Sequence, residues 1–100
     1  LVQAGFAKAE HEPDDLLPAA YAIAKKIVKH SPVAIALTRQ MMYRNAALPH
    51  PIGAHEVDSL AIFYASQTSG KEGVNAFLEK RKANFDDHAS TDMPPFYPWW

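Results

Sequence analysis

The sequence predicts an all-α protein with about four helices and an extended C-terminal tail rich in proline and aromatic residues. Two observations lead to this fold class. Apolar residues recur at helical spacing in four stretches, and most of these stretches begin with a residue that commonly starts a helix. No stretch of any length shows the apolar and polar alternation of a half-buried strand, and no internal repeat is present.

The first predicted helix begins after Pro13 and runs to about His30. Asp14 is placed as the N-cap, because its carboxylate can accept a hydrogen bond from a free N–H, and Asp15 adds a negative charge to the first turn. Pro18 is expected within the first turn, where its missing N–H had no helical partner. The apolar face consists of Leu16, Ala20, Ile23, Ala24, Ile27 and Val28.

The second predicted helix follows almost without a loop. Ser31 is a suitable N-cap, and Pro32 fits the first helical position. The helix is expected to end near residues 46–47, because the residues before Pro49 and Pro51 are pushed out of the helical region. Its apolar set is Val33, Ala36, Leu37 and Met41.

The third predicted helix lies after Gly53 and is expected to be the most buried of the four. Ile62 and Phe63 widen its apolar face, so that most of its circumference can be covered. The central apolar stripe is formed by Val57, Leu60, Ala61 and Tyr64.

The fourth predicted helix has the clearest start, because Ser69 and Glu72 have the spacing of a capping box. Its predicted apolar face is Val74, Phe77 and Leu78. Residues 86–92 are polar and are not expected to be helical. The prolines of residues 93–100 favour an extended chain, whose aromatic side chains must pack on a surface. The predicted division is a helical association domain over residues 1–88 and a tail over residues 89–100.

Composition excludes several classes of function. Lysine and arginine number 10 and aspartate and glutamate number 11, so no overall field attracts nucleic acid or an anionic membrane surface. Charged residues interrupt every apolar stretch before the roughly 20 residues that a membrane span needs, which predicts a soluble chain. The absence of cysteine excludes disulfides and thiolate chemistry and leaves a cytoplasmic or organelle-matrix location as the default. The sequence begins at Leu1, without an initiator Met and without the pattern of a signal peptide, which suggests a cut inside a longer protein.

The sequence alone indicates no complete active site. The five histidines lack the spacing that places two metal ligands on one helical face, and surface or capping roles are favoured for them. Glu56 and Asp58 are two residues apart on a helix and therefore point in different directions. No serine lies in a nucleophile-elbow context, and Gly70 with Gly73 falls short of a phosphate-binding loop.

Phe77 and Lys80 allow two interpretations. Three residues apart on a helix, they share a face, and an aromatic ring beside an ammonium group suits a ligand with both a base and a phosphate. Alternatively, Phe77 belongs to the core, and Lys80 with its basic neighbours complements the negative end of the helix. Spacing alone favours the second interpretation.

Three segments resemble the crotonase (enoyl-CoA hydratase/isomerase) family. Residues 72–81 (EGVNAFLEKR) resemble the family's C-terminal signature, and residues 31–38 (SPVAIALT) resemble the stretch that opens a helix in the same family. Leu1-Val2, followed by Leu16-Leu17, Ala20 and Ala24, resembles the family's glycine-leucine-valine strand end and the helix after it. The resemblance covers residues 1–85 in order. Arg39 departs from the lysine of many relatives, and the tail after Ala89 goes beyond the general pattern.

The resemblance implies an acyl-CoA substrate, a homo-oligomer and no cofactor apart from the coenzyme A of the substrate. It implies that Phe77 and Lys80 contribute to the CoA nucleotide pocket of a neighbouring subunit. The family's catalytic glutamates and oxyanion-hole N–H groups lie in a larger N-terminal domain, so no catalytic residue is expected in this chain. The expected function is the C-terminal part of an enoyl-CoA hydratase of fatty-acid metabolism. The alternatives are a non-catalytic helical assembly module or another crotonase-family enzyme, such as an isomerase or hydrolase.

Overall fold

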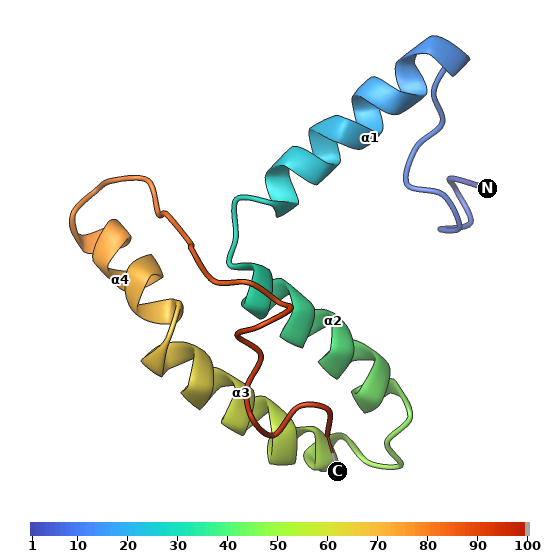
Figure 1. The fold of residues 1–100 in the computed structure, drawn as a ribbon. Coiled ribbons are helices and arrows are strands. Elements are labelled where there is room, and N and C mark those ends of the chain that lie inside the picture. Colours follow the sequence, from blue (N-terminus) through green and yellow to red (C-terminus); the bar gives the residue numbers. More distant parts are fainter. Residues whose placement is uncertain (100) are drawn as a thin grey trace.

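The structure, a computed structural model, describes residues 1–99 and contains four α-helices and one short 3-10 helix (Figure 1). No strand occurs within that range, which confirms the all-α fold class. The elements in chain order are α1 (Pro13–Ile27), α2 (Pro32–Ala46), η1 (Pro51–Ala54), α3 (His55–Gln67) and α4 (Gly70–Leu78). None of these helices is both long and apolar enough to cross a bilayer.

Helix α1 begins and ends earlier than the sequence predicted. Glu12 is the N-cap residue and Pro13 occupies the first turn, so the prediction that Asp14 caps the helix is wrong. Pro18 lies inside the helix and not in its first turn, so the carbonyl of Asp14 lacks the usual N–H donor four residues later. The helix ends at Ile27, because the chain turns through residues 28–30.

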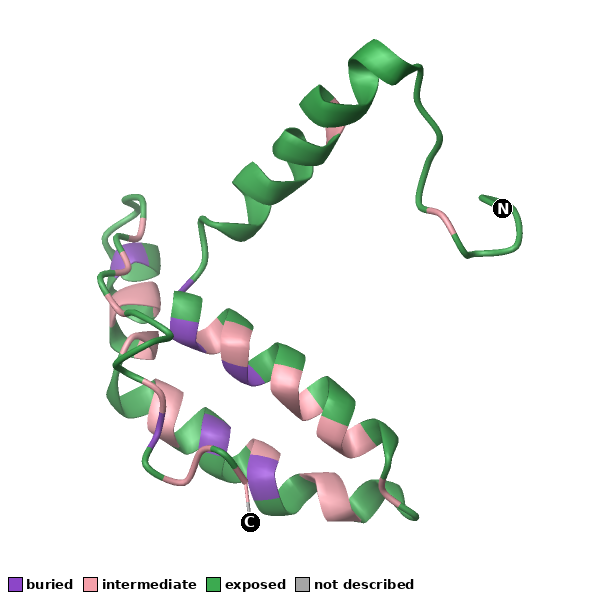
Figure 2. Cartoon of the chain, turned by 45° about the vertical axis from the view of Figure 1, so that its right-hand side comes forward, coloured by how far each residue is buried: buried purple, intermediate pink, exposed green. Residues whose placement is uncertain are grey.

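The predicted apolar face of α1 is present but uncovered. No residue of α1 is buried, and Leu16, Ile27 and Val28 of the predicted face have 55%, 46% and 76% of their surface exposed. Figures 1 and 2 show α1 projecting away from the other helices, joined to them by the short link before α2. The apolar face of this helix therefore has no partner among residues 1–99.

Helix α2 is predicted correctly in both position and capping. Ser31 Oγ accepts a 3.0 Å hydrogen bond from the N–H of Ala34, and Pro32 follows in the first turn. The helix buries Val33 and Leu37, which lie four residues apart on one face.

The core forms where α2 and α3 pack side by side. Val33, Leu37 and Ala61 are each 2% exposed and form one cluster, beside which Val57 is completely buried (Figure 2). The 3-10 helix η1 joins the two helices and leads directly into α3. At the same end of the pair, Arg44 and Glu56 form an ion pair at 3.7 Å.

Helix α3 is buried on one side only, so the expectation that it is the most buried helix is wrong. Ile62 and Phe63 are 67% and 66% exposed. The chain has too few helices to surround α3, and the two extra apolar positions therefore face outward.

We use the name C-terminal tail for residues 85–99 of the structure, which fold back over α2 and α3 without forming a helix. Pro94 is buried, and the partly buried Met93 and Trp99 pack against the core cluster. Tyr64 of α3 donates a 3.0 Å hydrogen bond to the carbonyl of Asp92 and contacts the Phe96 ring edge-on. The tail thus closes the open side of the α2–α3 pair, as its aromatic content required. Trp100 lies outside the described residues.

The chain is expanded for its length. Its radius of gyration is 16.8 Å, against about 13 Å for a compact domain of 100 residues. It exposes 8052 Å² of surface, whereas a compact monomer of 11.1 kDa exposes roughly 5,700 Å². The projecting α1 and the one-sided burial of α3 explain why the radius of gyration and the exposed surface are larger than those of a compact domain.

Candidate functional site

The end of α4 carries the two residues that the sequence singled out. Phe77 lies in the last turn and is 83% exposed, so it is not a core residue. Its predicted apolar neighbours Val74 and Leu78 are also exposed, and the helix instead buries Ala76. The apolar face predicted for α4 is therefore its outer face in this chain.

Lys80 does not share a helical face with Phe77, contrary to the prediction. The helix ends at Leu78, and Lys80 has a φ of 53°, in the left-handed region. The Arg81 N–H donates to the Ala76 carbonyl at 3.0 Å, and the Lys80 N–H donates to the Phe77 carbonyl at 3.2 Å. This pair of bonds is the Schellman motif, in which glycine is the usual residue at the left-handed position. Lys80 therefore leaves the helix at an angle that helical spacing does not describe.

Arg81 fixes the segment that follows α4. Its guanidinium donates two hydrogen bonds to the Glu72 carboxylate, at 2.6 and 2.9 Å, and also bonds Glu79. The Asn84 N–H donates to the same Glu72 carboxylate at 2.7 Å. The Arg81 hydrogen bonds, followed by that of Asn84, lower the pKa of Glu72 to about 2, and the two carboxylates raise the pKa of Arg81. The exposed turn that carries Lys80 is thus held between the end of α4 and the bonds that Arg81 and Asn84 make to Glu72.

This arrangement replaces the capping box predicted for α4. The Ser69 side chain makes no capping hydrogen bond to the helix, and Glu72 turns toward Arg81. A guanidinium offers the carboxylate two parallel charge-assisted hydrogen bonds, where the backbone N–H of Ser69 offers one neutral bond.

A polar junction joins the start of α2, the start of α4 and the tail. Asp87 Oδ2 accepts hydrogen bonds from Ser31 Oγ at 2.5 Å and from the Val33 N–H at 3.0 Å. Ser31 Oγ also lies 3.0 Å from Ser69 Oγ. The carboxylate therefore sits at the positive end of α2, where a negative charge is favoured. We use the name polar junction for Ser31, Ser69 and Asp87.

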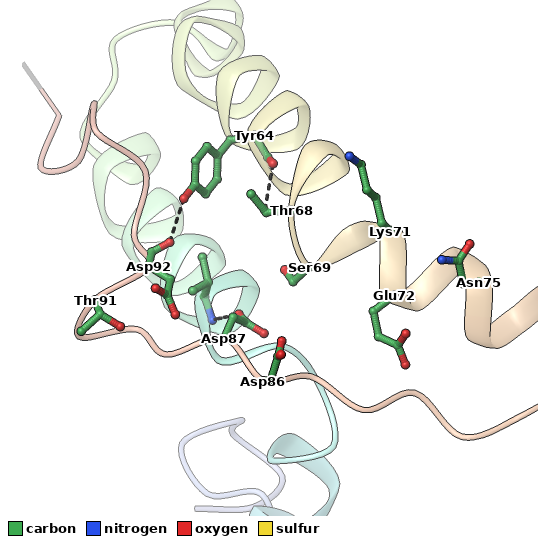
Figure 3. A pocket seen from close by; sticks show the side chains of 11 residues that line it. Tyr64, Thr68, Ser69, Lys71, Glu72, Asn75, Asp86, Asp87, Thr91 and Asp92 are labelled. Atoms are coloured by element: carbon green, nitrogen blue, oxygen red, sulfur yellow. Dashed lines mark hydrogen bonds between the residues drawn. The ribbon is translucent and has the colours of Figure 1, made fainter.

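An open pocket of about 680 Å³ lies beside the polar junction (Figure 3). Acidic side chains from α4 and the tail line it together with Lys71 and with the hydroxyls of Tyr64 and Thr68. Its acidic members are Glu72, Asp86, Asp87 and Asp92. Glu72 and Asp87 are engaged by hydrogen bonds within the fold, so the pocket holds no carboxylate pair arranged on a common target. Nor do His, Asp and Glu residues gather into a metal-binding group of three anywhere in residues 1–99.

Sequence reasoning missed Asp87 and treated Ser69 only as a helix cap. The signal at residues 86–87 was an acidic pair in a polar stretch, which is typical of a solvated tail. Only the return of the tail to the start of α2 gives Asp87 its donors.

Known proteins similar to this chain are enoyl-CoA hydratases. The chain is 37% identical over 84 residues to the enoyl-CoA hydratase AFT3-1 of Alternaria alternata. The aligned residues make up 82% of this chain and 28% of that protein. It is 36% identical over 77 residues to the crotonyl-CoA hydratase of Syntrophomonas wolfei, covering 74% of this chain and 28% of the relative. It is 32% identical over 87 residues to the mitochondrial enoyl-CoA hydratase of Pongo abelii, covering 85% and 29%. No family model matches the chain.

These matches agree with the motifs and with the all-α fold. The chain spans less than a third of the length of the relatives that it matches. Enoyl-CoA hydratases use no separate cofactor, and coenzyme A is part of their substrate. By its sequence, this chain matches part of a crotonase-family protein.

Proposed function

We propose that this chain is the C-terminal helical part of an enoyl-CoA hydratase, an enzyme that adds water to a 2-enoyl-CoA thioester in fatty-acid metabolism. The observation that carries the proposal is the identity of 37% to a hydratase over 82% of the chain. The proposed compartment is the cytoplasm or an organelle matrix.

The first proposed contribution is a contact with the nucleotide end of CoA through Phe77 and Lys80. The exposure of the Phe77 ring leaves its face free to stack on a base. Lys80 is exposed on the turn that Arg81 anchors, so its ammonium group can reach a phosphate without first being freed from a partner.

The second proposed contribution is subunit association through the uncovered apolar faces. Leu17 and Tyr21 of α1, together with Val28 at its C-cap, expose an apolar side whose contact with water costs free energy. An open apolar groove of about 580 Å³ on α2 includes Met42 and Tyr43 and continues to Ile27. A neighbouring subunit of the same protein would cover both surfaces.

The chemistry of hydration requires groups that we place outside this chain. Attack of water on the enoyl thioester develops negative charge on the thioester oxygen, which fixed N–H donors stabilise while carboxylates transfer the protons. Three of the carboxylates of the polar pocket, those of Glu72, Asp87 and Asp92, accept hydrogen bonds within the fold. We therefore expect the 100-residue chain alone to hydrate no enoyl-CoA.

The direct test is a CoA titration of the complete hydratase oligomer, followed by calorimetry. Lys80→Ala is expected to weaken CoA binding by about 1 kcal/mol, because one exposed charge-assisted hydrogen bond to phosphate is lost. Phe77→Ala is expected to weaken it by a similar amount through loss of stacking.

Lys71→Ala provides the matched control, because Lys71 is an exposed lysine at the start of α4, whereas Lys80 follows the end of that helix. Its affinity for CoA should equal that of the unmodified protein. Unchanged affinity in both Lys80→Ala and Phe77→Ala would contradict the proposed contact and return Lys80 to a role at the helix end.

A second candidate function is a non-catalytic helical assembly module, which the uncovered face of α1 also supports. A third is another crotonase-family reaction on an acyl-CoA, such as isomerisation or thioester hydrolysis. Assay of the complete protein with a 2-enoyl-CoA separates the three. Hydration supports the hydratase, a different acyl-CoA product supports the third candidate, and no turnover supports the module.

A further inference from the structure

A basic pocket lies where the end of α1, the start of α2 and the segment after α4 meet. It has a volume of about 480 Å³ and is lined by Lys25, Lys29 and His30 on one side and by Lys82 on the other. No aspartate or glutamate lines it, and Phe85 contributes an aromatic wall. We call this site the basic pocket.

Local structure explains only part of this charge. Lys25 lies in the last turn of α1, where the helix dipole favours a cation, and Lys29 follows just beyond the helix end. Lys82 lies in an irregular segment, so no helix dipole explains its positive charge. In residues 1–99 none of the three lysines forms an ion pair.

Like charges that converge from distant segments repel one another. Lys25 in the last turn of α1 and Lys29 just beyond its end bring two cations to the same side of the pocket. Lys82 adds a third cation from the other side of the pocket. A bound anion would remove this repulsion and give each ammonium group a partner.

We propose that the basic pocket binds the phosphate group of a phosphorylated small molecule. Three ammonium groups supply the donors that a phosphate dianion accepts, and the volume of about 480 Å³ admits a diphosphate with part of the group that carries it. Phe85 and the neighbouring apolar residues give that carried group a surface to contact. The site uses neither Phe77 nor Lys80, and the inference does not rest on the proposed CoA contact.

The test is a titration of the isotope-labelled chain with inorganic pyrophosphate, followed by amide chemical shifts in NMR. The largest shifts are expected at residues 28–30 and 82–85, the two sides of the pocket. Lys29→Gln and Lys82→Gln are each expected to weaken binding roughly three- to tenfold, because each removes one partly screened charge. Raising the salt concentration should weaken binding further.

A control variant makes the result specific. Lys71→Gln removes an exposed lysine that lines the other, polar pocket. It should bind pyrophosphate as the unmodified chain does. Absence of shifts at the two sides of the basic pocket, or equal weakening in all three variants, would overturn the proposal.

Discussion

At the scale of single residues, Asp87 makes two of the hydrogen bonds that join segments far apart in the sequence. Its Oδ2 atom accepts from the Ser31 hydroxyl and from the Val33 N–H, so one carboxylate connects the tail to the start of α2. Ser31 is 4% exposed and would lose a partner if this carboxylate were removed. A buried hydroxyl without its acceptor is costly.

We predict that Asp87→Ala destabilises the chain by about 2 kcal/mol, because two hydrogen bonds at a helix N-terminus are lost together. Thermal unfolding followed by circular dichroism measures the change. Asp86→Ala is the control, since Asp86 is exposed and neighbours Asp87 in sequence, and it should change stability by less than about 0.5 kcal/mol. Equal effects of the two variants would exclude a special role for Asp87.

Glu72 makes stability depend on pH in the acid range. Its pKa is about 2 in the folded chain and 4.5 in its ordinary state, so the folded form favours the charged carboxylate. The resulting stabilisation is fully present above pH 4.5 and is lost as the pH falls toward 2. We predict that Glu72→Gln flattens the fall in melting temperature over this interval.

The measurement is a series of thermal unfolding curves between neutral pH and pH 2. Glu10→Gln serves as control, because Glu10 is exposed and has no ion pair among residues 1–99, and it should leave the pH dependence unchanged. A Glu72→Gln variant that loses stability with the same pH profile as the unmodified chain would contradict the assignment.

At the scale of elements, the two ends of α4 are set by different constraints. At its start, a Cβ atom on Gly70 would lie 2.5 Å from the carbonyl oxygen of Ala65 in α3, so α4 can leave α3 at this angle only with glycine there. At its end, Lys80 takes a left-handed conformation that disfavours any side chain.

The start of α4 yields a matched pair of variants. We predict that Gly70→Ala destabilises the chain by at least about 2 kcal/mol, because backbone atoms must move to admit the methyl group. Gly73→Ala should stabilise it by about 0.5–1 kcal/mol, because alanine favours a helix and the new atom meets only Phe85, at 3.9 Å. Chemical denaturation of both variants measures the difference, and a stabilising Gly70→Ala would show that the α3–α4 turn is not so constrained.

The end of α4 gives a prediction of opposite sign. Lys80→Gly is expected to stabilise the chain by about 1 kcal/mol, because glycine adopts a positive φ without steric cost. The same change at Lys82, whose φ is not positive, should destabilise it slightly. A loss of stability in Lys80→Gly, measured by thermal unfolding, would contradict the Schellman assignment.

At the scale of the whole molecule, the chain exposes much more apolar surface than a compact monomer does. The uncovered sides of α1 and α3 belong to a fold whose core lies only between α2, α3 and the tail. Hydrophobic surface of this extent favours association.

We predict that the chain self-associates and that Leu17→Lys weakens this association by tenfold or more, because a charge enters the apolar side of α1. Analytical ultracentrifugation measures it. Ala22→Lys adds the same charge to the opposite side of the helix and should leave association nearly unchanged. A chain that sediments as a monomer at every concentration would exclude α1 as an association surface.

The all-α class, the position and capping of α2, and the lack of a helix over residues 86–92 can all be predicted from the sequence alone. Apolar spacing and the Ser31-Pro32 helix start depend only on residues close in the sequence, so they predict a helix without knowledge of the tertiary structure. The resemblance to the hydratases was also legible, and it supplied Phe77 and Lys80 where physical reasoning alone favoured a structural role.

Which apolar faces are covered, and which polar side chains meet, depends on the tertiary structure. Glu72 bonds Arg81 and not the predicted Ser69, and Asp87 bonds Ser31, 56 positions earlier in the chain. Contacts across such separations depend on where the helices and the tail come to lie, and local spacing carries no information on that placement. The same reason applies to Phe77 and Lys80, whose relative direction follows from one left-handed residue that helical periodicity does not reveal.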